Sequence, residues 1–204
     1  MALLHAFRQG IDPIPMANQE LSQQLRCLCL GSIAGCSLTQ RTMVMTTSMP
    51  SLFVSHGAPD LPLSECPARE FLSQLGKQLP EPRAILVVSP HWMTSVPTLS
   101  TASQMNAIHD FGGFSPALYQ LRYDAPGLSA DFHRAIAAQL KAANLPMAQD
   151  PARGLDHGAW VPLKLMYPDA QIPVGQLSLP AHWQPTQLLD FGKAIAPLKA
   201  KGVP

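Results

Sequence analysis

The feature that most constrains the fold is an unbroken apolar run, Ala-Ile-Leu-Val-Val, at residues 84–88. The run is short, rich in β-branched residues and not interrupted by polar positions. This pattern is typical of a strand that is covered on both faces, as the strands of parallel sheets are. The run continues into Ser89-Pro90-His91-Trp92, so a histidine follows directly where the predicted strand stops.

Other segments predict helices and strands in alternation. We expect two more strands, at Leu52–Val54 and Ile172–Leu179, and helical spacing of apolar residues predicts four helices, at 68–79, 131–143, 158–166 and 185–199. Such alternation indicates an α/β fold, a three-layer αβα arrangement with a mainly parallel central sheet. A βαβ progression would place another strand after the last helix. The sheet is therefore expected to be incomplete at the C-terminus.

Composition excludes some classes of partner. The chain has 204 residues, of which 47% are hydrophobic and 13% charged, and this suits one domain with a substantial core. Its formal net charge is +1, and no basic stripe occurs along the sequence. No electrostatic field is available to recruit nucleic acid or a membrane surface. We expect neither as a partner, and the sequence does not indicate an oligomeric state.

Residues 1–48 differ from the remainder. They show no sustained helical or strand period, and their best apolar window, Leu28–Cys36, is too short to cross a bilayer. We predict a disordered or mis-called extension, followed by a folded domain at 49–204. The alternative is export, because Ile33-Ala34-Gly35-Cys36 resembles a lipoprotein processing site. A mis-called start would place the true first residue at one of three methionines, namely Met43, Met45 or Met49.

The cysteines give little sign of a disulfide framework. There are four, Cys27, Cys29, Cys36 and Cys66, and no C-x-x-C pair occurs. A cysteine-based zinc site is not expected either. This usage fits a reducing compartment, and we predict a cytoplasmic location.

Two histidines follow predicted strands. His56 comes after Leu52–Val54 and His91 after the run at 84–88, and they are 35 residues apart. Ligands of parallel α/β sheets collect at the carboxyl ends of the strands. If these strands are neighbours, both imidazoles face one crevice, where neutral imidazole is a common metal ligand. The alternative is that each is a turn histidine bonded to a backbone carbonyl.

Two further histidines precede possible binding elements. His157 lies between Asp156, a candidate helix cap, and Gly158. His109 precedes an aromatic, glycine-containing loop at 111–114, which is suited to lining the pocket of a flat apolar substrate. An ordinary capping turn and a packed surface loop are the alternatives. His182 is a weaker metal candidate, and His133 is predicted to be a surface residue.

Several common catalytic motifs are absent from the sequence. It contains no G-x-G-x-x-G, Walker loop, G-x-S-x-G or H-E-x-x-H. Dinucleotide binding, P-loop chemistry and serine hydrolysis therefore have no support. A metal bound by histidines is the chemistry that remains.

Four motifs together carry a resemblance. "LFVSHGAP", "VVSPHW", "IHDFGGFSPALYQLRYDAPG" and "GLDHGAWVPLKLMYP" occur in this order. The set resembles the class III extradiol ring-cleavage dioxygenases, specifically the 4,5-DOPA dioxygenase branch, over residues 50–203. The resemblance implies an αβα enzyme that cleaves a catechol such as DOPA with O₂. It further implies one Fe(II) or Zn(II) per chain held by His56 and His91, with His157 and His109 at the substrate pocket as catalytic residues.

The chain also departs from this family. The family continues into a further strand, a histidine taken as the acid/base and a histidine that is the third metal ligand, and no matching segment occurs here. We therefore expect a C-terminally truncated member with weak metal binding and little or no turnover. The alternative hypotheses are a non-catalytic interaction module of the same fold and a zinc hydrolase, for which Asp110 and Asp156 are the available carboxylates.

Overall fold

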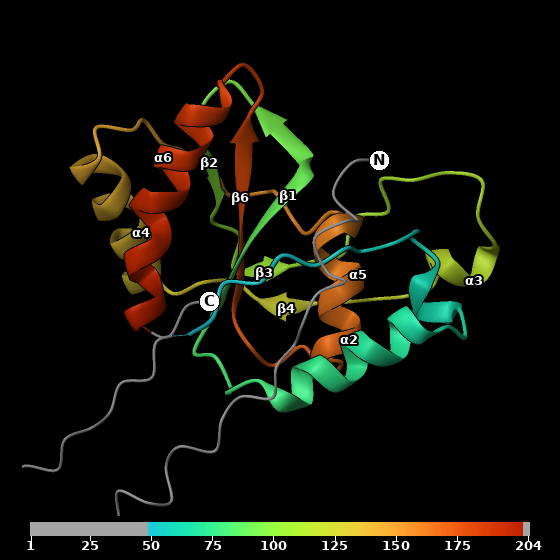
Figure 1. Cartoon of the computed structure of the whole chain (residues 1–204). Helices are drawn as coiled ribbons and strands as arrows, with labels where there is room; N and C mark the ends of the chain where they lie inside the picture. Colours follow the sequence, from blue (N-terminus) through green and yellow to red (C-terminus); the bar gives the residue numbers. More distant parts are fainter. Residues whose placement is uncertain (1–48, 202–204) are drawn as a thin grey trace, which may run out of the picture. The chain divides into compact units, whose positions relative to one another are not determined.

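The computed structural model describes residues 49–201. The predicted extension at 1–48 lies outside the described residues, so its boundary with the folded domain stays a prediction. Within the described range a four-stranded sheet is flanked by helices on both faces, as Figure 1 shows. The predicted three-layer α/β fold is confirmed.

The sheet has the strand order β1-β6-β2-β5 and is mostly parallel. Strand β1 (Ile85–Thr94) pairs in parallel with β6 (Val174–Pro180), and β2 (Thr98–Ser100) pairs in parallel with β5 (Ala148–Asp150). The junction between β2 and β6 is antiparallel, with Leu99 opposite Leu177. Mixed pairing at one junction therefore joins two parallel pairs into a single sheet.

Strand β6 is the strand that is covered on both faces. Residues 84–88 were predicted to be covered in this way, and that prediction was wrong in part. Six of the seven residues of β6 are buried. Strand β1 lies at the sheet edge, and Val88 is 39% exposed although Ala84 is fully buried. The apolar run therefore marks a strand, but sequence cannot show that the strand occupies an edge.

Two hydrophobic clusters fill the spaces between the layers. Helices α4 (Ala130–Ala142) and α6 (Pro185–Ile195) cover one face, around Ile136, Leu140 and Phe191. Helices α2 (Pro67–Gln78) and α5 (His157–Met166) cover the other, around Leu72 and Trp160. These four helices agree with the predicted ranges to within a few residues, because their apolar positions recur at the helical period.

Close packing of α2 on α5 depends on one glycine. A Cβ atom built on Gly76 would lie 2.1 Å from the carbonyl oxygen of Met166. The two helix backbones can approach to this extent only where no side chain intervenes. The contact fixes the C-terminal end of α5 against α2, at the opposite end of the helix from His157.

Several short elements complete the described part of the chain. They are the 3₁₀ helices η1 (Leu61–Leu63) and η2 (Ala196–Lys201), helix α3 (Pro116–Tyr119), and the antiparallel pair β3 (Gln104–Met105) and β4 (Ala125–Pro126). None was predicted, since elements of two to six residues show too little periodicity. Helix α6 ends at Ile195 and η2 follows, so the helix is shorter than the predicted range 185–199.

The strand predicted at Leu52–Val54 is wrong. These residues pair with no strand within residues 49–201, and the Phe53 side chain is 83% exposed. A short apolar segment forms a strand only when a neighbouring strand can accept its backbone hydrogen bonds. None of the described helices is long and apolar enough to span a membrane.

Candidate metal centre

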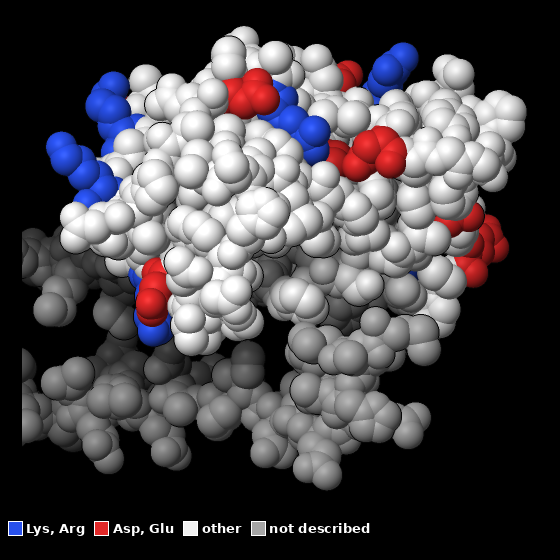
Figure 2. All heavy atoms as spheres, turned by 90° about the horizontal axis from the view of Figure 1, so that it is seen from above, with Lys and Arg blue, Asp and Glu red and all other residues white. Residues whose placement is uncertain are grey.

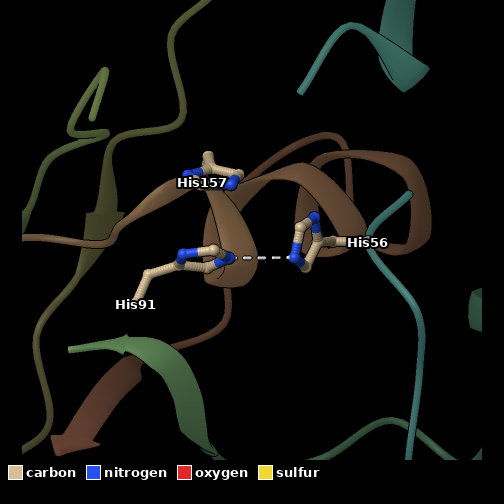
Figure 3. A group of neighbouring side chains, drawn as sticks. All are labelled: His56, His91 and His157. Atoms are coloured by element: carbon tan, nitrogen blue, oxygen red, sulfur yellow. Dashed lines mark hydrogen bonds between the residues drawn. The ribbon is translucent and has the colours of Figure 1, made fainter. Parts of the chain in front are cut away.

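Three histidines from three separate segments meet at one place. His56 comes from the loop before η1, His91 from β1, and His157 from the first turn of α5 (Figure 3). One nitrogen from each ring lies within 4.8 Å of the others. The ring centroids are 5.0 Å apart for His56–His91, 4.9 Å for His56–His157 and 4.0 Å for His91–His157. We call these residues the three-histidine group.

His91 reaches the group through an irregularity in β1. Between Val88 and Met93 the register with β6 shifts, and five positions along β1 match two along β6. Pro90 within this stretch has no N–H to donate to the sheet, which favours such a break. The strand continues to Thr94, so His91 lies within β1. The predicted position at a strand end is therefore wrong, although the exposed imidazole does join His56.

His56 is placed by a tight turn. The next residue, Gly57, has a φ of 63°, in the left-handed region that glycine adopts without strain. Burial lowers the pKa of His56, and repulsion from any positive charge on His157 and His91 lowers it further. The imidazole is therefore held in the neutral form that binds metal ions.

His157 is placed by the start of α5. Asp156 caps the helix, and its Oδ1 accepts the Ala159 N–H at 3.2 Å, so the predicted cap is confirmed. A Cβ atom on Gly158 would lie 2.5 Å from Ser89 Oγ and 2.7 Å from His91 Cδ2. Only glycine lets the helix start lie this close to β1.

The orientation of His157 is set by Asp110. The Oδ1 atom of Asp110 accepts hydrogen bonds from the backbone N–H and from ring Nδ1 of His157, both at 2.9 Å. Nδ1 must carry a proton to donate to the carboxylate, so in the neutral ring Nε2 is the nitrogen with the lone pair. Burial alone would raise the pKa of Asp110, but these hydrogen bonds hold the pKa below its ordinary value. The pair therefore consists of a carboxylate and a histidine ring of fixed orientation.

The donor atoms fit a small divalent metal. His56 Nε2 and His91 Nε2 are 3.0 Å apart. Two nitrogens that bind one ion at about 2.0–2.1 Å and at a right angle lie roughly 3 Å from each other. Imidazole nitrogens suit zinc and iron, and a carboxylate behind one ring is the usual support of such sites. The exposed side of His91 leaves room for further ligands.

Comparison with known proteins shows to which family the chain belongs. Residues 43–202 match the family described as the catalytic LigB subunit of aromatic ring-opening dioxygenase. The chain belongs to this family. The predicted resemblance to class III extradiol dioxygenases is confirmed at this level.

Relatives of the LigB-family chain carry a more specific name. It is 42% identical over 157 residues to the 4,5-DOPA dioxygenase extradiol of Beta vulgaris, covering 75% of this chain and 58% of that protein. It is 39% identical over 171 residues to the 4,5-DOPA dioxygenase extradiol of Escherichia coli K12, covering 81% and 60%. The chain thus spans about three-fifths of the length of these relatives.

A solved structure supports the fold of the LigB-family chain. The crystal structure of an uncharacterized protein from Escherichia coli K12 superimposes with a TM-score of 0.55 at 30% identity, covering 69% of this chain and 51% of that one.

His109 does not join the three-histidine group. Its Nε2 lies 3.1 Å from the Leu121 carbonyl oxygen, and its ring contacts Tyr119 and Trp160. The Phe111 ring lies 5.6 Å from the ring of His109 and 5.8 Å from that of His157. His109 is thus one aromatic ring away from the group, and its catalytic role stays a prediction.

The remaining histidine predictions have mixed outcomes. His182 is exposed beyond β6 and lies outside the group. His133 is half-buried in α4, with a buried Nε2 that has no hydrogen-bond partner among the described residues, so it is only in part the surface residue that was predicted.

Two polar residues behind the group were not predicted from the sequence. Ser89 and Gln176 are buried, and both hydrogen-bond to the carboxylate of Asp156. The available signal was Gln176 itself, an amide in the middle of β6, where Ser178 is the only other polar side chain. A buried polar residue in a central strand needs a partner, and this one predicts a network nearby.

Proposed function

We propose that the chain is part of an extradiol dioxygenase that cleaves the aromatic ring of a catechol such as DOPA with O₂. The observation that carries the proposal is the three-histidine group in a chain whose family is described as an aromatic ring-opening dioxygenase. The names of the relatives add the extradiol reaction and the DOPA substrate class. The overall change opens one ring carbon–carbon bond beside the diol and adds both atoms of O₂ to the product.

In this proposal His56 and His91 hold one Fe(II). Bound iron supplies the one-electron chemistry that O₂ requires, whereas zinc has no redox chemistry of its own. Both imidazoles approach through Nε2, and the lowered pKa of His56 keeps its lone pair available near neutral pH. The open side of His91 gives the catechol access.

His157 is proposed as the base that takes a proton from a catechol hydroxyl. Its Nδ1 is committed to Asp110, which leaves Nε2 as the acceptor. The carboxylate stabilises the imidazolium that forms when the proton arrives. The ring lies 4.0 Å from that of His91, so a catechol held beside His91 would be within its reach.

The aromatic residues beside the group are proposed to wall the substrate ring. Phe111 contacts the rings of Phe114 and Tyr119 as well as that of His157. Flat apolar side chains favour an aromatic substrate and exclude water from one side of it. On the face seen in Figure 2, acidic and basic side chains are scattered among mostly uncharged residues.

The two carboxylates considered for a zinc hydrolase are both engaged by other groups. Such an enzyme needs a carboxylate that is free to activate water. Asp110 is occupied by His157, and Asp156 is fully buried with its oxygens bonded to other groups. A non-catalytic module of the same fold remains testable by metal binding. The cytoplasmic location rests on cysteine usage and stays a prediction.

Anaerobic titration with Fe(II) tests the proposal. One ion per chain should bind, and His56→Ala or His91→Ala should weaken binding by at least about 100-fold. His182→Ala is the matched control, since that histidine is exposed outside the group, and should leave binding unchanged. Absence of stoichiometric binding would refute the metal site.

Addition of DOPA and then O₂ to the loaded chain tests the reaction. Any turnover, expected to be small for this chain, should yield the yellow ring-opened semialdehyde. His157→Ala should abolish product while one Fe(II) still binds. If His157→Ala lost the metal as completely as His91→Ala does, His157 would be a ligand and its assignment as base would be wrong.

A further inference from the structure

A buried carboxylate lies behind the three-histidine group. Asp156 is fully buried, although a carboxylate in such a place costs several kcal/mol unless it is well paired. Its Oδ1 accepts from the Ser89 hydroxyl at 2.7 Å and from the Ala159 N–H at 3.2 Å. Its Oδ2 accepts from Arg153 Nη2 at 3.2 Å and from Gln176 Nε2. Both oxygens of the Asp156 carboxylate therefore accept hydrogen bonds.

One of these bonds leads to His91. The Ser89 Oγ atom that donates to Asp156 also accepts the backbone N–H of His91 at 3.2 Å. This bond lies within the irregular part of β1, where the ladder to β6 does not fix the backbone. Asp156 therefore holds His91 through a single intervening hydroxyl.

Other bonds lead to His157 and to the centre of the sheet. Asp156 directly precedes His157 and caps the helix that carries it. The Asp156 N–H donates to Gln176 Oε1 at 3.3 Å, and Gln176 is fully buried in β6. The Arg153 guanidinium lies 4.9 Å from the centre of the Trp92 ring. The carboxylate thus ties β1, β6 and α5 together at the place where the histidines meet.

We propose that Asp156 is a positioning residue that sets the geometry of the histidine centre. It acts on His91 through Ser89 and on His157 through the start of α5. The inference rests on the proposed function, in which those two histidines act as ligand and base. Metal ligands need to be held within about 0.5 Å, and loss of their supporting residues typically lowers metal affinity about 10- to 100-fold.

Titration of the metal-free chain with Co(II), followed by visible absorption, tests this role. Ser89→Ala and Asp156→Asn should each weaken binding about 10- to 100-fold and change the absorption of the bound ion. Ser178→Ala and Asp190→Asn are the matched controls. Ser178 is buried but bonds to Thr94 and Thr98, and Asp190 is an exposed carboxylate of α6. Both controls should bind within about twofold of the wild type.

The ring nitrogens of the metal-free chain give a second measurement. Long-range ¹H–¹⁵N spectra should show shifted His91 and His157 signals in Ser89→Ala and Asp156→Asn, and unshifted signals in the controls. If Asp156→Asn does not fold, Ser89→Ala decides, because it keeps the carboxylate and its Arg153 partner. Folded variants with wild-type affinity and spectra would overturn the positioning role.

The outcomes separate the two proposals. Weakened Co(II) binding in both variants, with no ring-opened product from the wild type, would refute the dioxygenase activity and sustain the positioning role. Ring-opened product from the wild type, with unchanged binding in both variants, would refute the positioning role alone. A wild-type chain that binds no Co(II) would overturn both.

Discussion

The substitution Gly158→Ala tests how tightly helix α5 is fitted against β1. The added Cβ would lie 2.7 Å from His91 Cδ2, whereas carbon atoms in contact lie about 3.5–4.0 Å apart. The His91 ring or the start of α5 must therefore move by roughly 0.8 Å or more. A misplacement of about 1 Å can cost 100-fold in rate, and we expect a loss of this order in single-turnover product formation.

Stability should respond differently from activity. Replacing glycine by alanine in a helix gains up to about 1 kcal/mol from backbone propensity, whereas overpacking costs about 1–3 kcal/mol. We expect Gly158→Ala to lower the free energy of unfolding by up to about 2 kcal/mol in urea titrations. Gly192→Ala, on α6 with no atom within 4 Å of its Cβ, should raise it by about 0.5–1 kcal/mol.

A second glycine separates misplacement from instability. Gly76→Ala would press on the Met166 backbone and destabilise the domain without touching a histidine. At temperatures where both variants are folded, Gly76→Ala should keep its Fe(II) affinity and Gly158→Ala should lose about tenfold or more. Equal metal affinity in Gly158→Ala and the wild type would refute the reasoning, because the histidines would then tolerate the displaced helix.

Other expectations follow from the same contacts. Asp110→Asn should reduce single-turnover product about 10- to 100-fold while Fe(II) still binds, because a neutral amide no longer stabilises the protonated His157 ring; an unchanged yield would contradict this role. Tyr123→Phe should raise the free energy of unfolding by up to about 1 kcal/mol, because the buried Tyr123 hydroxyl has no hydrogen-bond partner among the described residues. A loss of stability would mean that the hydroxyl does have a hydrogen-bond partner. Without metal, the pKa of His56 in the folded chain lies below its unfolded value of 6.5, so the unfolded chain binds more protons as the pH falls. The free energy of unfolding should therefore decrease as the pH drops below about 6.5. His56→Gln should flatten this dependence in urea titrations between about pH 5 and 8.

The long helices could be predicted from sequence because their information is local. The apolar positions of α2 and α4 recur at the helical period, and the capping Asp156 marks the start of α5 within the sequence itself. The three-residue strands β2 and β5 carry no such signal, because they exist only through their pairing with each other and with β6. The false strand at Leu52–Val54 is the converse case, an apolar segment without a partner.

Part of the site could be predicted because its histidines lie next to glycine and proline, which mark unusual backbone. The proximity of His56 and His91 was inferred from two strand ends, yet neither residue lies at one. The inference of proximity nevertheless held, since a turn at Gly57 and an irregularity in β1 bring the two rings together. The hydrogen bonds of Ser89 and Gln176 could not be predicted, because they depend on which strands are neighbours.

The sequence Asp156-His157-Gly158 combines three tasks in one helix turn. The carboxylate holds β1 through Ser89, the imidazole is turned by Asp110, and the glycine leaves space for the His91 ring. Each task depends on the others, because a longer side chain at 158 would separate the carboxylate from Ser89, and a freed helix start would carry the imidazole away from Asp110. Effects of substitutions within this turn should therefore not add, since contacting residues share one displacement. The three residues at the start of α5 therefore act together, and their shared effect is to position the imidazoles of His91 and His157.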